Sequence, residues 1–266
     1  MNRAVVDRVA DAVLYEGYIL YPYRPSVKNR QRWTFGGLYP EAYSRAGGGA
    51  DACANQTECL IEGGADAAVE VVVRFLHLTA RRVGAFDPPL AEWRADEVGP
   101  PRPVETLRIG DRYFHSWQEA EEREVALGAL TIAELLGGPR LREFVMLGGR
   151  RREPLHGEGG AVVGVLEREQ QPLAGAVEVA ATPAGDGAFR LTVRVVNRTP
   201  FAGGGRDDAL LRSLISAHTI LGVQNGEFVS LLDPPAERRE AAAACLNVGV
   251  WPVLVGEDGS RELMLS

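Results

Sequence analysis

The fold class is indicated most directly by the stretch Val69-Glu70-Val71-Val72-Val73-Arg74-Phe75-Leu76-His77-Leu78. Side chains alternate along a β-strand, so the odd-numbered side chains of this stretch share one face and the even-numbered ones share the other. Both faces become largely apolar towards Leu78, which is typical of a strand that is covered on both sides. We therefore expect a strand that is partly sandwiched inside a sheet-rich protein.

Paired apolar runs around glycine-containing turns indicate antiparallel hairpins on the C-terminal side of this strand. Asn-Gly and Asp-Gly steps favour tight turns because both residues tolerate a positive φ. Four such turns are Gly110-Asp111, Gly185-Asp186-Gly187, Asn225-Gly226 and Asp258-Gly259. They predict hairpins over residues 104–117, 177–195, 219–231 and 250–265. The expected class is α+β, mainly antiparallel β, hairpin-rich and sandwich-like, with a few short helices.

Helices are expected at only a few places. Valines at every fourth position indicate an opening helix over residues 5–15. Two adjacent aspartates indicate an acid-capped helix start over residues 207–211. A third helix is expected to begin with Asp233 as its cap, to carry proline in its first turn, and to end near Cys245. Residues 121–136 fit either a helix or a buried strand.

A proline-rich stretch, residues 99–103, is the best candidate for a domain boundary. It would separate an N-terminal region, residues 1–102, from a hairpin-rich region, residues 103–266. One continuous domain fits the same pattern. The apolar ending at residues 263–266 lacks a polar tail, so we expect the chain to be a piece of a longer parent protein.

Composition and charge restrict the class of protein. Hydrophobic residues make up 45% and charged residues 24% of the chain, as in soluble folded proteins. No apolar run is long enough to span a bilayer, and the start lacks the pattern of a signal peptide. An odd number of cysteines argues against a secreted disulfide framework, so we expect a cytoplasmic protein with reduced thiols. The net charge of −7 argues against nucleic-acid binding.

Patterns for catalysis or cofactor binding are weak. A Gly-x-Ser-x-Gly nucleophile elbow is missing from the sequence. The glycine run 203–205 precedes a helix, but Asp207 and Asp208 would repel a phosphate there. No catalytic residue and no cofactor is predicted. A metal or thiol site stays open as an alternative, formed on folding by Cys59, His77, His218 and Cys245.

The most distinctive stretch is an aromatic-basic segment, residues 21–33. Its cations alternate with aromatic rings beside two prolines, and the residues concerned are Tyr21, Tyr23, Arg24, Lys28, Arg30, Arg32 and Trp33. Aromatic and arginine side chains are common anchors of protein interfaces. The arginines could instead bind an anionic ligand, or cation–π contacts could brace the segment across its own sheet. The residues alone leave these three interpretations open.

Several phrases of the sequence resemble one protein family. They lie at residues 13–24, 32–36, 56–60, 74–78, 197–201, 216–221 and 226–256, and include Arg32-Trp33-Thr34-Phe35-Gly36 and Trp251-Pro252-Val253-Leu254-Val255-Gly256. The chain resembles, over nearly its whole length, a family of bacterial accessory proteins encoded beside actinobacterial-type, high-affinity nickel–iron (NiFe) hydrogenases. The resemblance implies an accessory or assembly role and supplies no catalytic residues. Members of that family continue beyond residue 265, in line with a longer parent.

The leading hypothesis is a non-enzymatic accessory, assembly or scaffold protein for a NiFe hydrogenase system. The aromatic-basic segment would contact a protein partner, such as hydrogenase subunits or maturation factors, and the protein could also form oligomers. The alternative is a metal- or small-ligand-binding protein, or a thiol-dependent enzyme, that uses clustered Cys and His residues. A small-ligand-binding sandwich would need a closed apolar pocket behind residues 69–78.

Overall fold

The computed structural model describes residues 37–94, 99–257 and 259–266 of the chain. The expected opening helix and the aromatic-basic segment lie outside these residues. Within them, strands dominate and pair antiparallel throughout, which confirms the α+β, mainly antiparallel class. None of the helices described is long and apolar enough to cross a membrane.

One long strand organises the sheet. Strand β1 (Ala54–Leu90) contains 37 residues and includes the stretch 69–78 in its middle. It pairs antiparallel with β2 (Arg102–Val104), β5 (Trp117–Thr131), β8 (Val162–Gln170), β10 (Ala188–Asn197) and β11 (Ile215–Val229). At Val69 the partners are Val223 on one edge and Leu130 on the other. The stretch is therefore an interior strand, because both of its edges are hydrogen-bonded.

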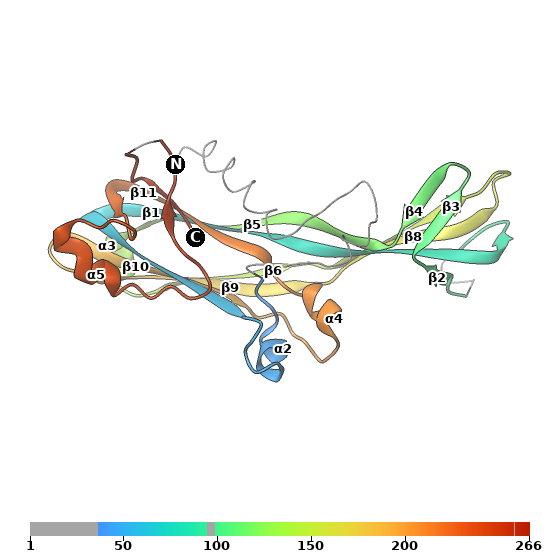
Figure 1. Ribbon diagram of the computed structural model, residues 1–266, viewed down its shortest axis with the longest axis horizontal. Helices are drawn as coiled ribbons and strands as arrows, with labels where there is room; N and C mark the ends of the chain where they lie inside the picture. Colours follow the sequence, from blue (N-terminus) through green and yellow to red (C-terminus); the bar gives the residue numbers. More distant parts are fainter. Residues whose placement is uncertain (1–36, 95–98, 258) are drawn as a thin grey trace.

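The sheet folds over on itself and forms two layers. The register of β1 with β11 shifts between Gly63 and Ala68, and β1 bends there. Residues 54–62, before the bend, pair with β10, whereas residues 68–81, after it, pair with β5. β10, β9 (Leu173–Pro183) and β6 (Arg140–Met146) run beneath β5 and β11 (Figure 1). Phe75 of β1 packs on Phe144 of β6 with ring centroids 5.9 Å apart, although these strands are not neighbours in the sheet. Apolar side chains from both layers fill the space behind residues 69–75. The arrangement is thus sandwich-like, and its interior is packed.

The far end of β1 extends away from the two layers as an arm (Figure 1). We use this name for β2, β7 (Gly149–His156), β8, and the two-stranded sheet β3 (Thr106–Ile109) and β4 (Arg112–His115). Val83, Phe114 and Leu166 form a small core between this hairpin and the sheet. The hairpin at Gly110-Asp111 is therefore confirmed. β1 pairs with β2, which contains the end of the proline-rich stretch. The predicted domain boundary near residue 102 stays a prediction.

Two further predicted hairpins are confirmed and one is wrong. β9 pairs with β10 across the turn at residues 184–187, and β12 (Val253–Leu254) pairs with β13 (Leu263–Leu265). At Asn225-Gly226 the chain bends but does not reverse, because β11 continues through these residues to Val229. Asn225 does adopt a positive φ of 56°. A Cβ at Gly226 would lie 2.8 Å from the Glu62 carbonyl oxygen, so glycine here permits close approach to β1.

The helices are short: α2 (Glu41–Ala46), α3 (Ile132–Leu136), α4 (Arg206–Leu210), the 3-10 helix η2 (Ala236–Arg238) and α5 (Arg239–Ala243). The ambiguous stretch 121–136 contains both predicted structures, since β5 ends at Thr131 and α3 follows. A capping box marks the change: the Glu134 N–H donates to Thr131 Oγ1 at 3.2 Å and the Thr131 N–H donates to the Glu134 carboxylate at 2.8 Å. Asp233 was expected to cap the last helix, but η2 begins after Pro235.

Candidate functional site

An apolar groove lies on the surface formed by the segment that follows β11. The groove has a volume of about 560 Å³ and is lined by residues 231–234, by α5 and by residues between 245 and 251. Three large side chains on its rim are exposed: Leu232 by 71%, Leu246 by 61% and Trp251 by 60%. The three side chains line the same groove, together with the polar side chains of Asp233, Arg239 and Asn247. We call this site the C-terminal groove.

The floor of the groove is anchored in the sheet. Ala242 of α5 packs with Leu60 of β1 and Val229 of β11, all of them buried. Cys245 lies beside this cluster and donates its thiol hydrogen to the Ala241 carbonyl oxygen at 3.6 Å. The buried residues therefore hold the fold, whereas the rim leucines and Trp251 contribute little to the core.

Backbone and side-chain hydrogen bonds fix the far wall. The Glu58 N–H donates to Asn247 Oδ1 at 2.8 Å, and Asn247 Nδ2 donates to the Glu58 carbonyl oxygen at 3.2 Å. The Leu246 N–H donates to the Glu58 carboxylate at 2.7 Å. Gln56 and Val248 exchange two backbone hydrogen bonds, of 3.0 and 2.9 Å. Three consecutive residues of the wall, 246–248, are thus hydrogen-bonded to β1. These bonds make the groove a preformed surface.

The two cysteines of the predicted metal or thiol site come close to each other. Cys59 is completely buried, and burial, together with the nearby Cys245 and Glu58, raises the pKa of its thiol well above the ordinary value. Burial also raises the pKa of Cys245, although Arg190 acts in the opposite direction. Both thiols are therefore protonated near neutral pH. Nucleophilic catalysis requires the thiolate, so this environment opposes it.

The two histidines of the same prediction lie elsewhere. His77 Nε2 lies 2.7 Å from the Gln171 carbonyl oxygen, so this nitrogen carries the hydrogen, and burial lowers the pKa of the ring. His218 Nε2 lies 3.1 Å from Ser216 Oγ on β11. Among the described residues, no group of three or more side chains of metal-ligating type comes together.

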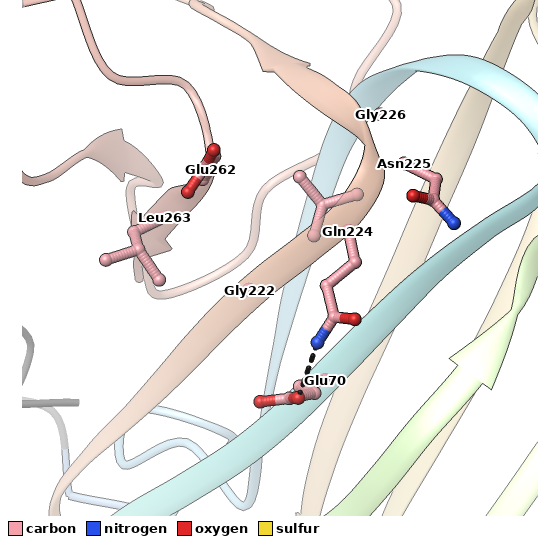
Figure 2. Close-up of a pocket in the computed structure, with 8 residues that line it drawn as sticks. Glu70, Gly222, Gln224, Asn225, Gly226, Glu262 and Leu263 are labelled. Carbon is pink, nitrogen blue, oxygen red and sulfur yellow. Dashed lines mark hydrogen bonds between the residues drawn. The ribbon is translucent and has the colours of Figure 1, made fainter. Parts of the chain in front are cut away.

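A second, smaller pocket lies at the bend of β11 and is shown in Figure 2. Its volume is about 290 Å³, and its lining includes Glu70, Gln224 and Glu262. Gln224 Nε2 points at Glu70 and donates to its carboxylate at 3.1 Å, while Glu262 lies on the opposite side (Figure 2). The pocket combines two carboxylates with backbone of glycine residues and lacks an aromatic anchor. It is a weaker candidate for protein binding than the C-terminal groove.

Ion pairs cover the sheet where the arm begins. Arg150 and Arg152 of the arginine run on β7 both pair with Glu167, at 2.7 and 2.6 Å. On the other face, Glu119 accepts from Arg168 at 2.8 Å and from Arg81 at 3.2 Å. Burial alone would raise the pKa of Glu119, but the hydrogen bond and charge of Arg168, with Trp117 and Arg81, hold it below the ordinary value. These contacts stabilise the sheet at the base of the arm.

No protein-family model matches the chain, and no match is found among the curated proteins. The C-terminal groove is therefore judged on its geometry alone. Sequence reasoning missed it because Leu232, Leu246 and Trp251 are ordinary apolar residues in the sequence. Their exposure becomes visible only when the chain around them is folded.

Proposed function

We propose that this chain is a non-enzymatic accessory or scaffold protein that binds a protein partner at the C-terminal groove. The observation that carries the proposal is the exposure of Trp251, Leu232 and Leu246 on a wall that Glu58 and Asn247 hold in place. Tryptophan is one of the residues enriched at the hot spots of protein interfaces. A rigid groove also binds at a smaller entropic cost than one that must first be ordered.

The resemblance described above indicates the partner. It supports a subunit or maturation factor of a NiFe hydrogenase, located in the cytoplasm. The aromatic-basic segment, with Arg24, Arg30 and Arg32, would supply a second, charged contact. An apolar groove and a separate basic segment suit a scaffold that holds a large partner at two points.

The environment of the thiols supports a binding role over the metal or thiol alternative. Burial of Cys59 and the raised pKa of Cys245 oppose thiolate formation, and His77 and His218 lie apart from them. A bound metal would be recognised by elemental analysis of the purified protein. Stoichiometric nickel, iron or zinc that disappears with Cys59→Ser would favour the alternative.

The proposal is tested by co-expression with the hydrogenase subunits and maturation factors, followed by affinity purification. Trp251→Ala and Leu232→Ala should reduce the amount of co-purified partner, and Tyr113→Ala, an exposed aromatic on the arm, is the matched control. Charge reversal at Arg24, Arg30 and Arg32 tests the second contact separately. Unchanged recovery of the partner with both sets of variants would remove the proposal.

A further inference from the structure

In the part of the chain that the structure describes, strand β6 ends one side of the sheet and has an open edge. The strand order runs β1, β10, β9, β6, and within the described residues β6 pairs with β9 alone. Three apolar side chains on and just after β6 are exposed: Leu141 by 54%, Val145 by 66% and Leu147 by 81%. Open strand edges with exposed apolar side chains are templates for pairing with another strand.

The edge of the arm shows how such an edge is normally protected. Among the described residues, strand β7 also pairs on one side only, with β8, and it carries three consecutive arginines and Pro154. Charges and proline discourage pairing because a charge resists desolvation and proline lacks an N–H. Strand β6 lacks proline, and its two arginines, Arg140 and Arg142, alternate onto the face of Phe144. Leu141 and Val145 stand on the opposite, outward face, which Glu143 shares.

The position of β6 is fixed from the inside. Phe144 is buried and packs on Phe75 of β1 in the opposite layer, so the strand cannot rotate to hide its outward side chains. Beside them, Ala174 and Ala176 of β9 pair with Val145 and Glu143 and leave them uncovered. The open edge is therefore a rigid surface with backbone groups and apolar side chains available together.

We propose that this edge binds a second copy of the chain by antiparallel pairing of the two β6 strands. A two-fold axis at Glu143 places Leu141 of one copy opposite Val145 of the other, and the symmetry repeats this contact. Opposing residues of an antiparallel pair share one face, so both apolar contacts form on the outward face. Each Glu143 is neutralised within its own copy by Arg198, which lies 2.6 Å away, so the two carboxylates can approach the axis.

The self-complementary order of residues points to a copy of the same chain. An apolar side chain stands two positions before Glu143 and another two positions after it, so the strand is its own antiparallel match. The contact involves a single short strand, and interfaces below about 1,200 Å² are weak and reversible. The dimer should therefore depend on concentration in the micromolar range.

Sedimentation equilibrium over about 1–200 µM tests the pairing. The wild-type chain should shift from monomer to dimer across this range. Val145→Lys and Leu141→Lys should each weaken the association about tenfold or more, because a two-fold interface contains each substitution twice. Leu232→Lys, which changes an exposed leucine in the C-terminal groove, should leave the dimer unchanged. A wild-type chain that stays monomeric, or an equal effect of Leu232→Lys, overturns the proposal.

Cross-linking tests the register independently. Glu143→Cys, in a background of Cys53→Ser and Cys245→Ser, should form a covalent dimer on mild oxidation, because the two residues face each other at the axis. Leu232→Cys in the same background is the control. Equal yields of covalent dimer from the two variants would contradict pairing at β6. Neither result bears on partner binding, which Trp251→Ala reports separately.

Discussion

Asn247 acts as a strand partner for Glu58 by means of its side chain. Its amide oxygen accepts from the Glu58 N–H at 2.8 Å and its amide nitrogen donates to the Glu58 carbonyl oxygen at 3.2 Å, as a neighbouring backbone would. The Leu246 N–H completes the contact at the Glu58 carboxylate. One asparagine thus attaches the wall of the C-terminal groove to the start of β1.

Asn247→Ala should lower the free energy of unfolding by about 1–3 kcal/mol, because it removes two hydrogen bonds and leaves the backbone of Glu58 unpaired. Chemical denaturation with a fluorescence readout measures the change. Gln224→Ala is the matched control, since its amide makes one exposed hydrogen bond with Glu70. Its effect should stay within about 0.5 kcal/mol. Equal losses in the two variants would show that Asn247 has no special structural role.

The three cysteines should differ in their rates of alkylation. Cys59 is buried and its pKa is raised, so iodoacetamide at pH 8 should leave it unmodified in the folded protein. Cys245 is half-buried with a raised pKa and should react slowly, and the half-buried Cys53 should react first. Peptide mass spectrometry against time measures the order. Rapid labelling of Cys59 would mean that the core around it opens far more readily than its packing indicates.

Glu119 should make stability depend on pH in the acid range. A carboxyl group whose pKa is lower in the folded than in the unfolded state stabilises the fold above its unfolded pKa. That stabilisation is lost as the pH falls through the folded pKa, where the carboxylate is protonated. Glu119→Gln should therefore lower the free energy of unfolding by about 1 kcal/mol or less at pH 7, since the side chain is one-third exposed. Below the folded pKa of Glu119 the substitution should not change the free energy of unfolding.

Urea denaturation of the wild type and Glu119→Gln at pH 7 and at pH 3 checks this dependence. The difference between the two proteins should shrink at the lower pH. A difference that is constant, or that grows on acidification, would show that the ion pairs with Arg168 and Arg81 do not lower the pKa of Glu119.

Local sequence signals predicted several strands and turns correctly, because alternation and turn chemistry are local properties. The Gly110-Asp111 hairpin and the β9–β10 hairpin have the positions expected from their turns. Asn225-Gly226 has the same sequence pattern but does not form a hairpin turn. Glycine is needed there because it lets β11 approach the backbone of Glu62. A contact between residues so distant in sequence cannot be recognised from the local pattern.

The length of β1 and the candidate site needed the folded structure. Nothing in residues 54–90 indicates that one strand continues through both layers and the arm, because its partners come from five separate parts of the chain. The proximity of Cys59 to Cys245 likewise follows from the attachment of residues 246–248 to β1. The aromatic-basic segment stays a prediction, since it lies outside the described residues.

The most direct test of the proposed function is a binding titration between the purified chain and purified hydrogenase subunits or maturation factors. We predict saturable binding that Trp251→Ala weakens about thirtyfold or more, the effect expected of an interface anchor, while Tyr113→Ala leaves the affinity unchanged. Circular dichroism should show that both variants remain folded. Absence of binding, or the same affinity for Trp251→Ala and the wild type, would contradict the assignment of the C-terminal groove as the partner site.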